Sequence, residues 1–245
     1  MAILYRTSIG HIRGKLGDTV IQRKFKKNVV SLRPEHYITK SEKLKSNRKE
    51  FAIKVMFAKA INRCIFLVKS WENCDIKSIS GYHNAISFNS KNIKNGVPTN
   101  FNAITPPFHI LLDRDKSVFL ESSHSFQGNK ISFDYSLKIP DEVDFEPTYV
   151  FALVLVLMFS DGKADRISTM TFDKDVDIEE KSSNGLNRLE FEFTDEETEY
   201  MKKYRLMRGY FAFVKPCLDN KYTRFTNSVF FEENLNDYYN PIKQS

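Results

Sequence analysis

The strongest constraint on the fold is an uninterrupted run of eleven apolar residues, Tyr149 to Phe159. A helix that crosses a membrane needs about 20 such residues, so this run is too short to span one. A short apolar run bounded by turn signals is typical of a buried strand. The sequence Ser160-Asp161-Gly162-Lys163 follows it and predicts a hairpin turn, because glycine tolerates positive φ. We therefore expect a buried strand at residues 149–159.

Short segments of strand character, separated by turns, fill residues 106–235. This pattern is typical of an antiparallel β-sandwich of immunoglobulin-like type. The Cys…Trp…Cys pattern of true immunoglobulin domains is absent from the sequence. A cap at Thr194–Glu197 predicts a short helix that ends near Tyr204. The predicted strands are Phe108–Leu112, Val118–Glu121, Lys130–Tyr135, Tyr149–Phe159, Arg166–Phe172, Arg188–Phe193, Tyr210–Lys215 and Tyr222–Phe231.

The first 105 residues follow a different pattern. Two predicted strands, Thr19–Arg23 and Asn28–Arg33, form a hairpin with a basic tip at Lys24–Lys27. Pro34 ends their pairing because it has no N–H group to donate.

A capping box at Thr39–Glu42 predicts the start of a long helix. We expect this helix to run from Lys40 to Trp71, with a break near Asn62, and a second helix to cover Tyr82–Asn92. Apolar residues recur at helical spacing along the long helix, while its other side is basic. The apolar stripe is Leu44, Phe51, Val55, Ala58, Ile61 or Asn62, Ile65 and Val68.

These patterns together predict an α+β protein. Its parts are a basic hairpin and helical portion at 1–105, an immunoglobulin-like β-sandwich at 106–235 and a loose tail at 236–245. The 21 Phe and 11 Tyr residues supply ample material for a core, which excludes a wholly disordered chain. Three Cys residues in 245 exclude a disulfide scaffold, and we expect them to be reduced thiols in a cytoplasmic protein.

Charge is divided unevenly along the chain. Residues 1–70 hold 17 Lys and Arg against 4 Asp and Glu, whereas residues 173–199 hold 3 against 11. Opposite charges on one chain favour head-to-tail contacts between subunits. The basic region also fits a nucleic-acid-binding surface, with Phe25 available to stack on bases. A third interpretation is a helix with a solvated basic face.

The candidate site residues follow from this division. The predicted partner- or polyanion-binding residues are Arg13, Lys15, Arg23, Lys24, Phe25, Lys26, Lys27 and Arg33. The predicted acidic partner patch consists of Asp173, Asp175, Asp177, Glu179 and Glu180.

Motifs for catalysis or for a cofactor are weak. The segment from Gly10 to Leu16 is one residue too short for a phosphate-binding loop, and Leu16 replaces the required hydroxyl. The acids at 173–179 alternate as in a calcium loop, but Ile178 occupies the position that requires glycine. Alternating acids of this kind are typical of a solvated face of a strand or loop. We predict no catalytic residues, no metal and no cofactor.

Several segments together resemble a family of uncharacterised bacterial proteins of similar length. The opening Gly10-x-x-x-Gly14-Lys15-x-Gly17-Asp18-x-Val20 is similar to the start of that family. Further matches are Arg48–Phe51, Tyr82–Asn89 with Lys91-Asn92, Tyr210–Phe213 and Thr226–Val229. Two features differ from the family. The helix lacks its usual Thr-x-Ala-Gln start, and the segment 174–204 is longer than its counterpart in the family. The resemblance implies a basic N-terminal portion followed by a β-sandwich, and it implies no catalytic residues.

The sequence therefore predicts a non-enzymatic structural or interaction protein. We expect it to join a larger assembly of protein subunits, such as a phage-like or mobile-element particle, with no contact to a membrane. It would be cytoplasmic, or associated with the particle after assembly. The alternative function is a nucleic-acid-binding module that uses the basic hairpin and helix.

Overall fold

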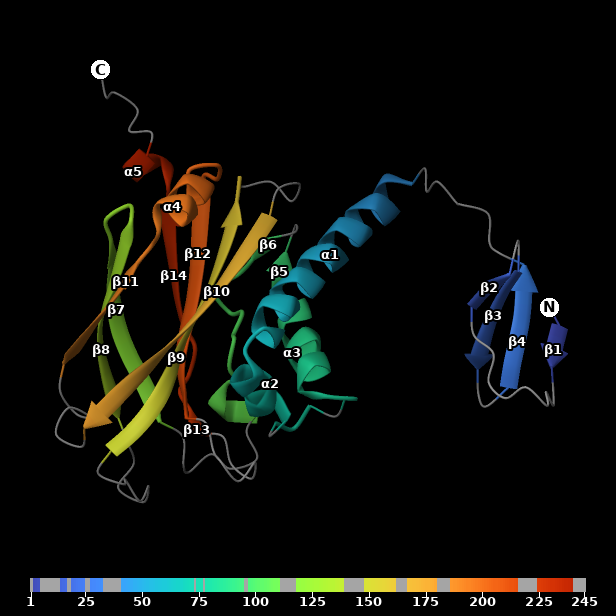
Figure 1. The fold of residues 1–245 in the computed structure, drawn as a ribbon, viewed down its shortest axis with the longest axis horizontal. Coiled ribbons are helices and arrows are strands. Elements are labelled where there is room, and N and C mark those ends of the chain that lie inside the picture. The colour runs from blue at the N-terminus through green and yellow to red at the C-terminus, as the bar shows by residue number, and fades with distance from the viewer. Residues whose placement is uncertain are drawn as a thin grey trace. The chain divides into compact units, whose positions relative to one another are not determined.

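The computed structural model divides the chain into two compact units, residues 1–45 and 46–245. Figure 1 labels the helices and strands of both units. The structure describes residues 2–4, 14–16, 19–24, 27–32, 41–72, 74–76, 78–94, 97–110, 118–138, 148–161, 167–179, 186–215 and 224–239.

The described part of the first unit is an antiparallel sheet in the order β1-β4-β3-β2. The predicted hairpin is confirmed, because β3 and β4 pair along their whole length and Lys24 lies opposite Lys27. The strands β1 and β2 add to the two sides of this hairpin. Their bounds are β1 Ala2–Leu4, β2 Gly14–Leu16, β3 Thr19–Lys24 and β4 Lys27–Leu32.

The second unit contains two larger antiparallel sheets among its described residues. One has the order β10-β9-β12, with β13 and β14 both paired to the far side of β12, and the other has the order β11-β8-β7. The strands of the first sheet are β9 Thr148–Ser160, β10 Ile167–Glu179, β12 Leu206–Lys215, β13 Arg224–Phe225 and β14 Val229–Asn234. Those of the second are β7 Phe119–Phe126, β8 Lys130–Lys138 and β11 Asn187–Glu192.

Alternate residues of β9 point into two different cores. Phe151, Leu155 and Phe159 belong to a core shared with the β11-β8-β7 sheet. Val154 and Val156 belong to a second core, which is shared with the helices. The predicted buried strand is therefore confirmed, and its unbroken apolar sequence follows from cover on both faces.

Three helices form the layer on the other side of the larger sheet (Figure 1). They are α1 Glu42–Asn62, α2 Ile65–Glu72 and α3 Gly81–Ser90. The ring of Phe57 on α1 meets that of Tyr210 on β12 edge to face, with centroids 5.2 Å apart. The buried indole of Trp71 donates from Nε1 to the carbonyl of Ile104 at 2.8 Å. The predicted break in the long helix is confirmed between Asn62 and Ile65.

Short elements complete the second unit. A small hairpin joins β5 Ile93–Lys94 to β6 Val97–Pro98. The helix α4, Asp195–Met201, begins with the predicted capping box between Thr194 and Glu197. The predicted strand at 108–112 is wrong over 108–110, which form the 3₁₀ helix η1 Phe108–Ile110. Its turn is closed by Ile110 N–H donating to the Pro107 carbonyl at 3.0 Å.

The boundaries of the units differ from those expected. The division lies at 45/46 rather than at 105/106, since the helices after residue 46 share a core with the larger sheet. The expected tail also begins with structure, because α5, Asn236–Tyr239, packs against the β11-β8-β7 side of the unit. Tyr239 donates from its hydroxyl to the Gly128 carbonyl. The predicted α+β class is confirmed by these sheets and helices.

Candidate functional site

Four of the eight predicted partner- or polyanion-binding residues lie on the sheet of the first unit. Lys15 lies on β2, Arg23 and Lys24 end β3, and Lys27 begins β4. The pairs 15 with 20 and 24 with 27 put positions 15, 24 and 27 on one face of the sheet, because opposed residues share a face. Position 23 falls on the other face. Arg13, Phe25, Lys26 and Arg33 lie outside the described residues.

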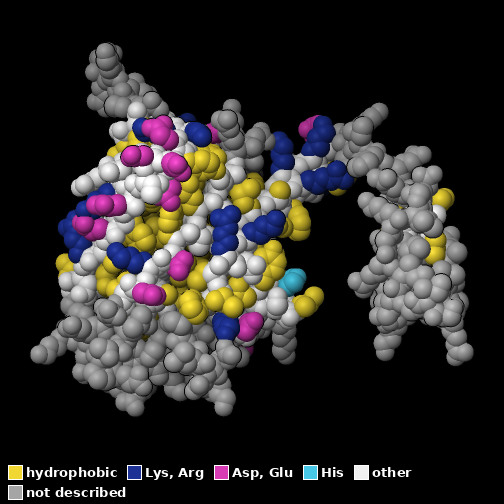
Figure 2. Space-filling view, in the orientation of Figure 1, with side chains coloured by type: hydrophobic (Ala, Val, Ile, Leu, Met, Phe, Trp, Pro, Cys, Tyr) yellow, Lys and Arg dark blue, Asp and Glu magenta, His cyan; other side chains and the backbone are white. Residues whose placement is uncertain are grey.

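The first half of α1 carries more exposed cations. All residues from Glu42 to Lys49 are exposed to solvent, and Lys43, Lys45, Arg48 and Lys49 are among them. Figure 2 shows Lys and Arg side chains along this helix. The second half is different, because Ile53, Phe57 and Ile61 are buried. The helix is therefore anchored by its second half and free over its first.

The apolar side chains on the free half of α1 are also exposed. Leu44 is 51% exposed and Phe51 is 61% exposed, although the sequence pattern placed both in the core stripe. That expectation is wrong. Ile53 and Phe57 lie on nearly the opposite side of the helix from Leu44 and Phe51, since nine residues make about two and a half turns. Ala58 lies on the same side as Leu44 and Phe51 and is 1% exposed, so cover on this side is missing only along the first half of the helix.

The predicted acidic patch lies on β10, an edge strand of the larger sheet. Asp173 and Asp175 are exposed, and neither has an ion-pair partner among the described residues. They pair with Val154 and Ala152 of β9, so they lie on the face that carries the helices. Asp177 and Glu179 continue the strand, and Glu180 lies outside the described residues.

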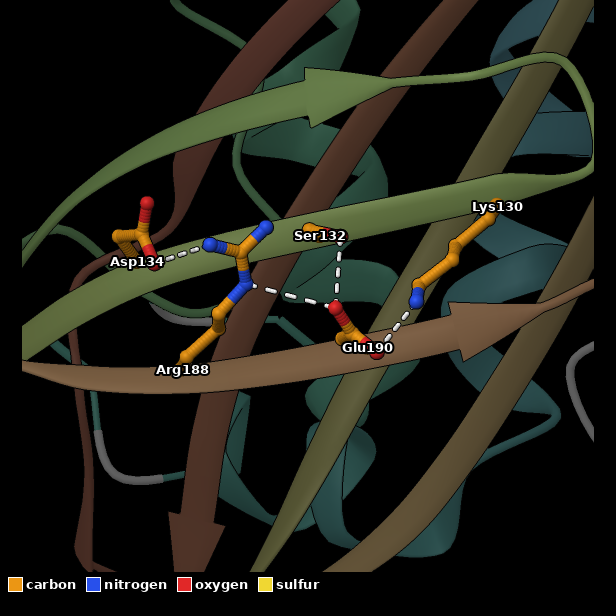
Figure 3. A network of polar contacts seen from close by, with 5 residues as sticks. All are labelled: Lys130, Ser132, Asp134, Arg188 and Glu190. Atoms are coloured by element: carbon orange, nitrogen blue, oxygen red, sulfur yellow. Dashed lines mark hydrogen bonds and ion pairs between the residues drawn. The ribbon is translucent and has the colours of Figure 1, made fainter.

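A second acidic strand, β11, differs because its charge is neutralised locally (Figure 3). Glu190 pairs with Lys130 and accepts from Ser132 Oγ at 3.3 Å, and Arg188 Nε lies 3.4 Å from Glu190 Oε1. Arg188 Nη1 also lies 3.9 Å from Asp134 Oδ1. The hydrogen bond from Lys130 holds the pKa of Glu190 below its usual value. These groups join β8 to β11, so we assign them to the fold rather than to a ligand.

A hydrogen-bonded chain of three side chains had no signal in the sequence, because its members are far apart along the chain. His124 on β7 contacts Glu233 on β14, with 2.8 Å between Nε2 and Oε1. Tyr238 on α5 donates to the other oxygen of the same carboxylate at 2.9 Å. Burial and the Glu233 carboxylate raise the pKa of Tyr238 to about 12. The chain fastens α5 to the two strands.

Neither a group of metal ligands nor a membrane-spanning helix is found among the described residues. In that part of the chain, no group of three or more His, Cys, Asp or Glu side chains gathers as metal ligands would. No described helix is both long and apolar enough to cross a membrane. The segment Gly14–Leu16, within the glycine-rich opening, is the strand β2.

Comparison with known proteins gives no assignment. No family model and no curated protein matches the chain, so the resemblance to uncharacterised bacterial proteins stays a prediction. One solved structure, that of CsgH from R. palustris, aligns with 49% of this chain and 95% of its own. The two are 7% identical with a TM-score of 0.22.

Proposed function

We propose that the chain is a non-enzymatic interaction protein that joins a larger assembly through contacts between subunits. The observation that supports this proposal most is that oppositely charged residues gather on different elements of the chain. Basic residues concentrate in residues 1–45 and on the first half of α1, whereas Asp173 and Asp175 lie exposed on an edge strand. Surfaces that differ in charge and lie on different elements favour heterologous contacts, which build rings or open arrays.

The composition of the first unit supports the same proposal. Residues 1–45 hold 11 Lys and Arg against 3 Asp and Glu. A small sheet buries little apolar surface by itself, and units of this size usually need outside support. A protein partner that covers the sheet would supply such support.

We also propose that the two packed sheets of the second unit are immunoglobulin-like. The order of their strands supports this when they are counted from β7, with β13 and β14 together as the seventh strand. The first, second and fifth strands (β7, β8 and β11) then form one sheet, and the fourth, third, sixth and seventh form the other. In immunoglobulin variable domains an added strand likewise joins the sheet that holds the third, sixth and seventh strands. Such sandwiches are common in interaction proteins, which suits the proposed role.

The oligomeric state of the full chain tests the proposed function. We expect light scattering coupled to size exclusion to show masses above 28.6 kDa that grow with protein concentration. Raising the salt concentration should lower these masses, because it screens contacts between exposed charges. A strict monomer at every concentration, which also captures no partner from native lysate, would contradict the proposal.

Nucleic-acid binding is the second candidate. The shared face of positions 15, 24 and 27 favours it, since three lysines there would follow a phosphate backbone. Labelled DNA and RNA should then bind with an affinity that falls steeply with salt. Replacing Lys15, Lys24 and Lys27 together by Gln should weaken binding at least tenfold, whereas Arg23→Gln should cost less. Undiminished binding by the triple variant would rule out this surface.

A further inference from the structure

The exposed apolar face of α1 is the feature that the fold leaves unexplained. Leu44 and Phe51 lie seven residues apart, which places them on one side of the helix at a spacing of about two turns. Exposed apolar side chains at this spacing, on a helix that projects beyond its core, are typical of helices that dock into a partner. Arg48 lies between the two anchors, and Lys45 and Lys49 flank them.

Charge disfavours simple pairing of this helix with its copy in another subunit. The segment from Glu42 to Phe51 holds four basic and two acidic residues, so two copies side by side would bring like net charges together. The complementary occupant is a surface with exposed acids around an exposed apolar side chain.

The same chain carries such a surface where α2 begins beside β10. Ile65, at the start of α2, is 61% exposed. The end of α1 just before it lies against β10, with Thr171 Oγ1 donating to the Ala60 carbonyl at 3.1 Å, and Asp173 is the next residue on that face of the strand. Arg63 reaches the same strand, with Nη1 donating to the Thr169 carbonyl at 3.4 Å. The start of α2 and the acids of β10 therefore form one surface, which we call the acceptor surface: Ile65, Asp173 and Asp175.

We propose that the first half of α1 docks, through Leu44 and Phe51, on the acceptor surface of a second copy of the chain. This inference rests on the proposed function and names the contact through which subunits would join. Each subunit offers one helix and one acceptor surface, so the contact is head-to-tail and can repeat. Arg48 and Lys49 would face Asp173 and Asp175, and the apolar anchors would lie against Ile65.

Sedimentation velocity on the full chain tests the proposal with matched variants. Leu44→Gln with Phe51→Gln removes the anchors and keeps good helix formers at both positions. Ile79→Gln with Phe101→Gln is the control, because these side chains are 89% and 71% exposed and lie elsewhere. We expect the anchor variant to associate at least tenfold more weakly and the control to associate like the natural chain. Circular dichroism checks that all variants are folded.

Mixing two defective variants tests the direction of the contact. Asp173→Lys with Asp175→Lys should block the acceptor surface and leave the helix intact. The anchor variant and this acceptor variant should each stay monomeric alone. An equimolar mixture of the two should form a 1:1 dimer that grows no further, because it contains one intact helix and one intact acceptor surface. Adding Arg48→Glu and Lys49→Glu to the acceptor variant should restore association by exchanging the charges.

The outcomes separate the two proposals. A natural chain that associates, with an anchor variant that associates equally well, overturns the docking of α1 and leaves the proposed assembly intact. A natural chain that is monomeric up to high concentration overturns the docking of α1 on a second copy, and it overturns the proposed assembly as well if it captures no partner from native lysate. A mixture of the two defective variants that stays monomeric overturns the head-to-tail contact.

Discussion

The two halves of α1 each carry a large aromatic side chain, and the surroundings of these two side chains are opposite. In the second half, Phe57 is 1% exposed and packs against Tyr210 of β12. In the first half, Phe51 is 61% exposed. The second half lies over the sheet, whereas the first half continues beyond it as a helix with little cover. An apolar residue on a helix is therefore a core residue only where another layer is present to receive it.

The same lesson applies to the two acidic strands. On β11, Glu190 is bonded to Lys130, Arg188 and Ser132, so its charge is used within the fold. On β10, Asp173 and Asp175 have no such partner among the described residues, so their charge remains available to another molecule. Charges on an edge strand also discourage uncontrolled strand pairing, which is compatible with a docked helix.

The largest expected effect comes from truncating the same residue type in the two halves of α1. Phe57→Ala should lower the free energy of unfolding by about 3–5 kcal/mol, because it leaves a cavity in the core. Phe51→Ala should change it by less than about 0.5 kcal/mol, since its side chain is largely exposed. Urea unfolding followed by Trp71 fluorescence measures both, since this residue is the single Trp and lies in the affected core. Equal losses would contradict the division of α1 into an anchored and a free half.

The next largest effect is a difference in reaction rate between a thiol placed on the first half of α1 and the buried thiols that follow its second half. Burial raises the pKa of the Cys64 and Cys74 thiols, so at pH 8 little of either is the reactive thiolate. In a Cys217→Ser background, Ser46→Cys should add one thiol that reacts roughly tenfold or more faster than the two buried ones. The rate of colour release from a disulfide reagent measures this difference. Rapid reaction of Cys64 in the folded protein would show that the anchored end opens easily.

A smaller effect is expected where β10 holds the anchored half. Thr171 donates from Oγ1 to the Ala60 carbonyl at 3.1 Å, so Thr171→Val should lower the free energy of unfolding by about 1 kcal/mol. Thr169→Val is the matched control, because α1 uses the backbone carbonyl of Thr169, which the substitution keeps. Urea unfolding of both variants provides the comparison. A larger drop in the free energy of unfolding for Thr169→Val than for Thr171→Val would contradict the role given to the Thr171 hydroxyl.

The smallest effect concerns the ion pair between the two halves. Glu50 and Lys54 lie one turn apart, with 3.7 Å between Oε1 and Nζ. Glu50→Gln should lower the free energy of unfolding by about 0.3 kcal/mol at low salt. A double-mutant cycle with Lys54→Gln isolates the pair, and its coupling should disappear at about 1 M salt. A coupling that persists at high salt would show that the pair is better shielded than its position suggests.

Sequence reasoning succeeded where a pattern has one physical outcome. The run from Tyr149 to Phe159 has no polar position, so it can only be a strand that is covered on both faces. The hairpin of β3 and β4 and the capping box at Thr194 depend on neighbouring residues alone. It failed at 108–110, where the residues after Pro106 and Pro107 form a 3₁₀ turn in place of the predicted strand.

Only the tertiary structure decided which half of α1 is covered. The sequence by itself determined the helix, its break after Asn62 and the basic character of its first half, because these depend on local spacing and composition. It marked Leu44, Phe51 and Ala58 alike as core, yet only Ala58 is buried, because it lies on the half of the helix that packs against the rest of the unit. It placed the acidic patch on the residues of β10, and the structure shows that pairing with β8 neutralises Glu190 of the other acidic strand, β11. Local patterns record what a residue can bury or bond, and the positions of other elements determine whether it does.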